Sequence, residues 1–461
     1  MKRDLAITTA EKIGSNVDIY GWVNTRRDHG KIIFLDIRDA SGLVQVVATP
    51  KNEEAYKVAN NLSGEDVVHI YGKVGERPKG NINPDLKTGK VEVSADSIEL
   101  ISKAKELPIP IEGDGYDIDE LVRYKYRYID LRRSRLQKNL KLRHKLVKQV
   151  HEFLDKENFT EIETPYLSKT TPEGARDFVV PSRLQKGKFY ALAQAPQQYK
   201  QLLMIAGVEK YYQIARAFRD EDLRADRQFE HTQIDLEMAF VEQEDILELV
   251  EKLIIQVSKK LGKKLSQTPF PKLTYEEAKS KYGTDKPNLE HSKEELSFLW
   301  VINFPLLEWD EENKKYTFSH NPFAAPNPED IDDLMKEKGL DKIKSLQYDL
   351  VCNGEEVGSG SIRITNPEIQ RKVFKLMGYS EKETEEQFGH LISAYEYGAP
   401  PHGGIALGLD RLTALFAQEE NIREVVAFPV ASSGKTSVMD APSEINPNQL
   451  SDFGLKKVGS K

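Results

Sequence analysis

The chain has 461 residues, which fits two or three domains, and its 39% hydrophobic and 30% charged residues are typical of a soluble globular protein. A single cysteine, Cys352, excludes an intrachain disulfide and a cysteine-rich zinc site, and the lack of a signal peptide or a membrane-length apolar run predicts a cytoplasmic protein without membrane association. The net charge of −8 argues against a generally basic nucleic-acid binder, although the segment from Arg123 to Lys148 has eleven Lys and Arg against one acidic residue.

Five short β-rich runs fill residues 14–101, with a helical stretch, Glu53–Asn61, between the third and the fourth. The runs are Val17–Val23, Ile32–Ile37, Leu43–Ala48, Val67–Val74 and Val91–Leu100. This order predicts an OB-fold barrel over residues 1–105, and such barrels often bind single-stranded nucleic acid. Arg26 and Phe34 suit that task, although composition alone favours a place for Phe34 in the barrel core.

A linker over residues 106–134 contains Leu107-Pro-Ile-Pro110, and a second domain is expected over 135–440. Apolar residues at every fourth position, from Leu142 to Leu154, predict a helix with one buried face. Its basic face could follow a phosphate backbone or simply face solvent. A second amphipathic helix is expected over 241–262, and a polar, loosely held tail over 441–461.

The runs 208–218 and 232–240 predict an antiparallel hairpin whose connecting loop contains both charge signs. Since strand side chains alternate, Gln233, Asp235 and Glu237 should share one face of the second strand and Ile234 the other. Polar residues repeated along a face indicate either a sheet that holds a polar ligand or a solvated edge. No GxxxxGK[ST] loop is present, so arginines on a sheet are the remaining way to hold a triphosphate.

The hairpin sequence FRDEDLRADRQFEHTQIDLE, residues 218–237, resembles motif 2 of class II aminoacyl-tRNA synthetases in the form found in bacterial-type aspartyl-tRNA synthetases (subclass b). The stretches 159–167, with Pro165, and 403–411 resemble motifs 1 and 3. The resemblance extends from about Val17 to Glu444 and implies an α+β fold, with a five-stranded OB barrel and a catalytic domain built on a mainly antiparallel sheet flanked by helices. The sequence departs from the family at Phe229, His231, Asn321 and Ser359, and near 285–298 it lacks the domain that long bacterial members insert.

The implied reaction is the ATP-dependent ligation of L-aspartate to tRNA(Asp) through an aspartyl-adenylate, performed by a cytoplasmic homodimer. Arg219 would contact the α-phosphate, Arg411 the γ-phosphate, and Glu221 and Gln228 the adenine or ribose. Mg²⁺ would be held by Asp349 and Glu356, without zinc. The catalytic residues are Arg219, Glu356 and Arg411; the ATP-binding residues are Arg219, Asp220, Glu221, Gln228, Glu356, Gly408, Leu409, Asp410 and Arg411.

Aspartate would be held by residues from several segments, namely Glu173, Gln197, Lys200, Arg219, Gln233, Asp235, His320 and Arg363. Lys200 and Arg363 would meet the side-chain carboxylate. Asparagine offers no charge to these cations, and two unpaired buried cations would cost roughly 3–5 kcal/mol, which favours aspartate as the substrate.

The contacts that the resemblance implies for tRNA are Arg26, His29, Phe34, Gln45, Gly80 and Glu92 at the anticodon, with Arg224 and Arg227 at the acceptor stem. Relatives that charge both tRNA(Asp) and tRNA(Asn) tend to have His and Gly at the positions of His29 and Gly80. The same residues are also ordinary turn residues. The pair predicts that tRNA(Asn) is charged too, with an amidotransferase as a partner that converts the product.

Three alternatives stay open at this point. An asparaginyl-tRNA synthetase shares the barrel and the motifs. An aspartate–ammonia ligase shares the catalytic fold but has no use for an anticodon-binding barrel. A non-catalytic nucleic-acid-binding OB-fold protein would not need Arg219, Glu356 and Arg411.

Overall fold

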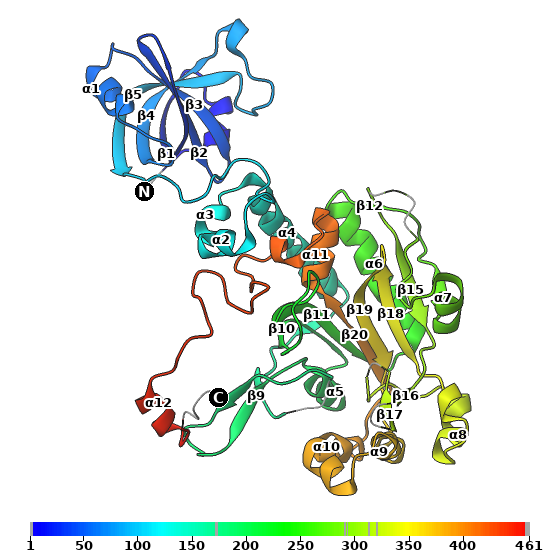
Figure 1. Ribbon diagram of the computed structural model, residues 1–461. Helices are drawn as coiled ribbons and strands as arrows, with labels where there is room; N and C mark the ends of the chain where they lie inside the picture. The colour runs from blue at the N-terminus through cyan, green and yellow to red at the C-terminus, as the bar shows by residue number, and fades with distance from the viewer. Residues whose placement is uncertain are drawn as a thin grey trace. The chain divides into compact units, whose positions relative to one another are not determined.

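The computed structural model describes residues 3–170, 174–289, 292, 294–311, 314–319 and 321–456. The chain forms two compact units, Met1–Pro110 and Ile111–Lys461, which Figure 1 shows in blue and in cyan to red. Among the described residues, no helix is both long and apolar enough to span a membrane.

The first unit is a closed barrel with the strand order β1-β2-β3-β5-β4, as expected for an OB-fold. Alternate residues of β2, including Ile33, Leu35 and Ile37, fill its core, whereas Phe34 points outward. The elements are η1 (Ala6–Glu11), β1 (Asn16–His29), β2 (Ile32–Asp39), β3 (Gly42–Ala48), α1 (Glu53–Asn60), β4 (Val67–Glu76), η2 (Lys79–Asn81) and β5 (Val91–Ser102).

The second unit is built on an eight-stranded sheet that is antiparallel except at its two edges, where β13 pairs with β15 and β6 with β10 in parallel. In order across the sheet, the strands are β13 (Lys272–Thr274), β15 (Phe298–Ile302), β18 (Gln347–Cys352), β19 (Glu355–Ile362), β20 (His402–Gly408), β11 (Glu230–Ala239), β10 (Lys210–Phe218) and β6 (Thr160–Glu161). The predicted hairpin is the pair β10–β11, and the mixed α and β content confirms the expected fold class.

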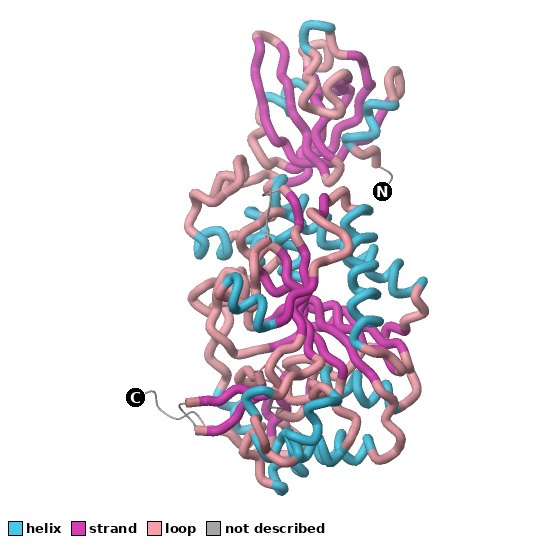
Figure 2. The backbone as a smooth tube through the Cα atoms, turned by 90° about the vertical axis from the view of Figure 1, so that its right-hand side faces the viewer, coloured by secondary structure: helices cyan, strands magenta, loops and turns pink. Residues whose placement is uncertain are grey.

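Three helices cover one face of this sheet, namely α4 (Ser134–Lys156), α6 (Gln243–Lys260) and α11 (Leu409–Ala417). Leu146 and Val150 of α4, together with Ile246 of α6, pack against Ile234 and Leu236 of β11. Figure 2 shows strands running through the middle of this unit with helices beside them. The helical periodicity of the sequence therefore correctly predicted which side chains of α4 and α6 are buried. The opposite face of the sheet can carry polar side chains.

Smaller elements complete the unit. The remaining helices are α2 (Glu120–Lys125), α3 (Arg127–Asp130), α5 (Gln197–Ile205), α7 (Tyr275–Tyr282), η3 (Pro328–Asp330), α8 (Ile331–Met335), η4 (Leu340–Lys342), α9 (Pro367–Leu376), α10 (Glu381–Tyr395), η5 (Ile422–Val425) and α12 (Pro447–Asp452). The short sheets are β7 (Leu167–Ser168), β9 (Phe189–Leu192) and β8 (Val179–Pro181), then β12 (Lys264–Leu265) with β14 (Glu295–Leu296), and β16 (Leu307–Asp310) with β17 (Lys315–Phe318).

The basic segment that starts at Arg123 is partly a structural cluster rather than a phosphate-facing surface. Arg123, Arg127 and Arg133 are buried and bond to the equally buried Asp130, and Arg123 also forms a two-bond pair with Glu424. Buried charges require such partners. These contacts tie residues 123–133, part of the segment expected as a linker, to the body of the second unit.

Candidate active site

A polar pocket opens on the sheet face opposite the three helices. Directly opposed residues of neighbouring strands share a face. The strand register therefore places Asp349, Ser359, Ala406 and Asp235 in one row across β18, β19, β20 and β11. The intervening residues, such as Ile234, belong to the hydrophobic core. The sheet thus supplies polar groups to the pocket from strands that are far apart in the sequence.

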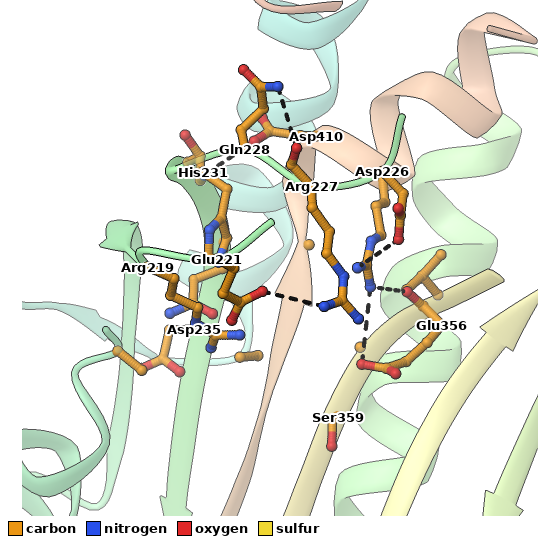
Figure 3. Close-up of a pocket in the computed structure, with 18 of the residues that line it drawn as sticks. Arg219, Glu221, Asp226, Arg227, Gln228, His231, Asp235, Glu356, Ser359 and Asp410 are labelled. Atoms are coloured by element: carbon orange, nitrogen blue, oxygen red, sulfur yellow. Dashed lines mark hydrogen bonds and ion pairs between the residues drawn. The ribbon is translucent and has the colours of Figure 1, made fainter. Parts of the chain in front are cut away.

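Figure 3 shows the charged side chains of the β10–β11 loop and of α11 gathered over this row. The lining includes Gln197, Arg219, Glu221, Asp226, Arg227, Gln228, His231, Gln233, Asp235, Lys286, Asn321, Glu356, Ser359, Gly408, Asp410 and Arg411. Most of the residues predicted for ATP and many of those predicted for aspartate therefore meet at one pocket. Glu173 and His320 lie outside the described residues.

Beneath one end of the pocket lies a buried cluster of two cations and two carboxylates. Lys200 Nζ donates to Asp235 Oδ1 at 2.6 Å and lies 3.2 Å from Glu237 Oε2. Arg363 donates from Nε and Nη2 to the two carboxylate oxygens of Glu237 at 2.8 and 3.0 Å. All four side chains are at most 3% exposed as residues, so the cluster is a fixed part of the site.

The charges of this cluster determine its protonation. Burial would raise the pKa of Glu237, but Arg363 and Lys200 outweigh it and lower that pKa to about 2. Burial raises the pKa of Asp235, and Lys200 offsets the increase only in part. The cluster therefore holds a firmly ionised Glu237 next to a carboxyl group that is more easily protonated.

This pairing corrects the charge argument made from the sequence. Lys200 and Arg363 are not two bare cations awaiting a substrate carboxylate, because Asp235 and Glu237 already balance them. A neutral side chain in place of the substrate carboxylate would therefore not leave two buried cations unpaired, and the preference for aspartate cannot rest on that cost.

Three buried polar atoms at this end have no hydrogen-bond partner within the described part of the chain. They are Gln197 Nε2, Gln233 Nε2 and Asp235 Oδ2, and all three residues line the pocket. Buried polar atoms are almost always bonded, so these positions indicate where a polar ligand completes the site.

At the other end of the pocket, most cations are paired with carboxylates. Arg411 Nη2 donates to Asp226 Oδ2 at 3.2 Å, and its Nη1 donates to the Glu356 carbonyl at 2.8 Å. Arg227 lies 3.4 Å from Glu221 and Lys286 lies 2.8 Å from Glu356. Arg219 differs, because its Nε donates only to the Gln194 carbonyl, at 3.4 Å, among the described residues.

Several predicted ATP ligands have structural partners. The Gln228 side-chain carbonyl accepts from the Val430 amide at 2.8 Å, and Asp410 accepts from the Thr232 amide at 3.1 Å while pairing with Arg143. Asp220 and Leu409 do not line the pocket, since Leu409 belongs to the core and Asp220 lies beside Arg176.

His231 lies on the pocket wall near Arg219 and Arg411. Burial, together with these guanidinium groups, lowers the pKa of the His231 imidazole to about 3, so the ring is neutral at pH 7. His231, one of the positions at which the sequence departs from the family, therefore contributes an uncharged ring to the pocket.

The acidic residues proposed for Mg²⁺ lie on the pocket side of the sheet. Glu356 lines the pocket, and Asp349 is buried in the row that contains Ser359. The part of the chain that the structure describes contains no cluster of three or more His, Cys, Asp or Glu side chains suited to a metal. Two carboxylates fit an ion that takes most of its ligands from water and phosphate oxygens.

In the barrel unit, the predicted tRNA contacts lie on two faces. Phe34 and Gln45 point outward from neighbouring strands. Gln45 donates to Glu92 at 2.8 Å and accepts at 3.3 Å from Arg27 of β1. Arg26 lies on the other face of β1, where it bonds to Asp28 and Asn60. His29 ends β1, and Gly80 lies in η2; both are exposed.

Sequence reasoning assigned no role to four residues of the site: Glu237, Asp226, His231 and Lys286. The alternation of β11 already placed Glu237 on the ligand side, which was a sufficient signal. Asp226 lies within the charged loop and His231 lies at its border. The sequence does not show that Asp226 pairs with Arg411 or that His231 lies near Arg219, because these contacts form only in the folded chain. Lys286 follows α7, and nothing in its local sequence connects it with Glu356.

The comparisons with known proteins agree with this geometry. Residues 119–432 match the model of tRNA synthetases class II (D, K and N), and residues 17–101 match the OB-fold nucleic acid binding domain. An aspartate–tRNA(Asp/Asn) ligase of Syntrophomonas wolfei is 40% identical, covering 96% of this chain and 97% of its own. An aspartate–tRNA ligase of Staphylococcus carnosus is 38% identical, covering 98% of both.

The alignment with the Syntrophomonas protein spans 571 positions, more than the 461 residues of this chain, so that relative contains segments that this chain lacks. Among solved structures, the asparaginyl-tRNA synthetase of Pyrococcus horikoshii complexed with asparaginyl-adenylate has a TM-score of 0.75 at 23% identity, covering 93% of this chain and 98% of that one. The similarity to the Pyrococcus structure is a similarity of fold.

Proposed function

Since the chain belongs to the class II tRNA synthetases of the aspartate, lysine and asparagine group, and within it to the aspartate–tRNA ligases, we propose that it joins L-aspartate to tRNA in an ATP-dependent reaction. The observation that carries this proposal is the pocket itself. It combines a buried cluster with unsatisfied polar atoms at one end and arginines suited to phosphate at the other.

In the first step, an oxygen of the aspartate α-carboxylate attacks the α-phosphorus of ATP. The bond between that phosphorus and the oxygen bridging to the β-phosphate breaks, and pyrophosphate leaves with the electron pair. Arg219 contacts the α-phosphate oxygens, where charge develops, and Arg411 holds the γ-phosphate end. Both act by positioning and electrostatic stabilisation rather than as nucleophiles.

In the second step, a hydroxyl at the 3′ end of tRNA attacks the carbonyl carbon of the adenylate, and AMP leaves. Arg224 and Arg227 of the β10–β11 loop would meet the acceptor stem, and their exposure supports this role, since Arg224 is exposed and the Arg227 side chain is 44% exposed. Glu356, with Asp349 of the same row as Ser359, would hold Mg²⁺, which would supply charge neutralisation to the phosphates.

Aspartate rather than asparagine is the amino acid that we assign. The charge-balanced cluster does not decide this, but both relatives described above are named for aspartate. Lys200 and Arg363 remain the proposed partners of the side-chain carboxylate, while Asp235 and the side-chain oxygen of Gln197 would accept from the α-ammonium group. The unpartnered Nε2 groups of Gln197 and Gln233 would donate to oxygens of the ligand.

The proposed partners are tRNA(Asp), tRNA(Asn) and a second copy of the chain. Some similar relatives are named aspartate–tRNA(Asp/Asn) ligase and others aspartate–tRNA ligase, so the names do not decide whether tRNA(Asn) is a substrate. The proposal for tRNA(Asn) therefore rests on His29 and Gly80. An amidotransferase would then convert the product. The segment that resembles motif 1 and the adjoining short sheet expose Leu167, Val179 and Phe189 by 51, 56 and 48%, which suits a dimer interface. A cytoplasmic location follows from the proposed role in tRNA charging.

Aspartate-dependent exchange of pyrophosphate into ATP tests the first step, with asparagine as the comparison. We expect aspartate to drive the exchange and asparagine not to drive it. Exchange driven by asparagine would assign the chain to the asparaginyl enzymes, and no exchange with either amino acid would favour a non-catalytic role. Charging of purified tRNA with labelled aspartate then tests the second step.

A further inference from the structure

Lys286 reaches the phosphate end of the pocket from outside the sheet and the motif-like segments. It lies between α7 and β14, in the connection that is short in this chain. Its Nζ is 2.8 Å from Glu356 Oε2, and its side chain is 35% exposed to the pocket that it lines. Lys286 of the connection between α7 and β14 therefore contacts Glu356, the carboxylate that we assign to Mg²⁺ in the proposed function.

The backbone around Lys286 is held at several points. Gly283, with φ of +71°, ends α7, and the Lys286 amide donates to Thr284 Oγ1 at 3.1 Å. Leu289 packs against Leu299 and Val301 in a buried cluster beneath the sheet edge. These contacts fix the position from which the flexible lysine side chain extends.

Two cations converge on Glu356, because Arg411 Nη1 is 4.0 Å from its Oε1. A divalent ion on the same carboxylate would add a third positive centre within a few ångströms, and like charges at that range repel strongly. The bound triphosphate would at the same time bring negative oxygens close to Lys286. Its ammonium has three donors on a flexible stem and can exchange a carboxylate for a phosphate oxygen.

We propose that Lys286 is a phosphate-binding residue that occupies Glu356 before ATP binds and contacts the β- and γ-phosphates once the metal occupies Glu356. The inference rests on the proposed function, because it requires ATP in this pocket. During adenylate formation Lys286 would face the departing pyrophosphate and stabilise the charge that it gains. No proton or covalent bond passes through the lysine.

The test is ATP binding by calorimetry in the absence of aspartate, so that no reaction occurs. Lys286→Met removes the charge and keeps an unbranched side chain, Lys286→Arg keeps the charge, and Lys281→Met changes an exposed lysine of α7 outside the pocket lining. At saturating Mg²⁺ we expect about tenfold weaker ATP binding for Lys286→Met, little change for Lys286→Arg, and wild-type binding for Lys281→Met.

A Mg²⁺ titration of ATP binding gives a second readout. Lys286 competes with the ion for Glu356. The Mg²⁺ concentration that gives half of the maximal increase in ATP affinity should therefore be lower in Lys286→Met than in the wild type. Thermal unfolding establishes that each variant is folded. ATP affinity and a Mg²⁺ midpoint equal to those of the wild type in Lys286→Met would overturn the inference while leaving the proposed function intact. A wild-type protein that binds no ATP would instead overturn the proposed function and, with it, the premise of this inference.

Discussion

At the scale of single residues, Arg219 is distinguished by the weakness of its contacts in the described part of the pocket, where its neighbours Arg227 and Arg411 have carboxylate partners. We expect Arg219→Ala to reduce aspartate-dependent pyrophosphate exchange by about 10²–10³, the usual effect of removing one preorganised donor at a charge-developing oxygen. Because the side chain holds one long hydrogen bond among the described residues, the melting temperature should hardly change. Exchange at the wild-type rate would remove Arg219 from the mechanism.

Arg363 is the residue whose replacement should affect both stability and substrate binding. Arg363→Leu leaves Glu237 buried with Lys200 as its remaining ion-pair partner in the described part of the chain, and breaking such a pair costs about 3–5 kcal/mol of folding free energy. The KM for aspartate should rise by a factor of about 30 or more, equivalent to about 2 kcal/mol, whereas the KM for ATP should stay nearly constant.

The double variant Glu237→Gln with Arg363→Leu separates these two effects. Removing both charges leaves no unpaired carboxylate at position 237, so urea unfolding should recover much of the lost stability. Aspartate affinity should stay low, since the proposed partner of its side chain is missing. A double variant that regains the wild-type KM for aspartate, or a single variant that changes the KM for ATP instead, would contradict the assignment of Arg363.

His231 should make stability depend on pH. Its folded pKa of about 3 lies below the ordinary 6.5, so the unfolded chain takes up a proton first as the pH falls. This contribution to stability is complete above about pH 6.5 and is lost progressively down to about pH 3. Between pH 7.5 and 5 the wild type should lose up to about 2 kcal/mol more than His231→Phe, measured by urea unfolding.

His144→Phe is the matched control for this measurement, because His144 is exposed on α4. It should keep the wild-type dependence of stability on pH. If the free energy of unfolding changed with pH by the same amount in the wild type and in His231→Phe, then His231 would take up its proton equally in the folded and unfolded chains.

At the scale of elements, the close contact between β20 and β11 depends on Gly404. A Cβ at this position would lie 2.1 Å from both Glu237 Oε2 and the Leu236 carbonyl oxygen, and a backbone atom cannot move aside alone. We expect Gly404→Ala to destabilise the second unit by about 2 kcal/mol or more and to weaken aspartate binding, because Glu237 must shift away from Arg363. Thermal unfolding and the KM for aspartate measure the two effects.

Gly75→Ala provides the comparison, since Gly75 also lies in a strand, β4, but a Cβ there meets no atom within 4 Å. Its effect on the second unit should be negligible. Equal stability of Gly404→Ala and the wild type would mean that the two strands can separate at little cost.

Strands and helices with a strong period could be predicted from the sequence. The barrel runs, the β10–β11 hairpin and the helix α6 form where the apolar pattern placed them, with ends within two residues, except that β1 continues to His29, six residues beyond the expected end at Val23. The alternation in β11 also separated Gln233 and Asp235 from Ile234 correctly. Pairings between distant segments were not predictable, because Lys200 with Asp235 or Lys286 with Glu356 depends on the packing of α5 and of the α7 connection against the sheet.

At the scale of the whole molecule, two separately folded units serve one proposed reaction. The sequence predicted the barrel because its turn signals are local, and residues 17–101 match the OB-fold nucleic acid binding domain. It did not predict the order of the strands in the large sheet. The neighbours β19 and β20 are separated by α9 and α10 in the chain, and no local signal connects them.

The barrel should also set which tRNAs the protein charges. The anticodons of tRNA(Asp) and tRNA(Asn), GUC and GUU, differ only at the third base. One mismatched base contact is usually worth about 1–3 kcal/mol, so a small number of side chains is enough to discriminate. His29, at the end of β1, and Gly80, in η2, are both exposed, and they are the two residues that we propose to border that base.

We therefore expect transcripts of both tRNAs to be aspartylated, with kcat/KM values within about a hundredfold of each other, equivalent to about 2.7 kcal/mol. The double variant His29→Leu with Gly80→Lys should shift the ratio toward tRNA(Asp), because it replaces both residues that we propose to permit the second tRNA with different, bulkier or charged side chains. Pyrophosphate exchange should be unchanged in this variant, since no residue of the pocket is altered. A wild-type preference for tRNA(Asp) above a hundredfold would show that the turn residues do not permit the second tRNA.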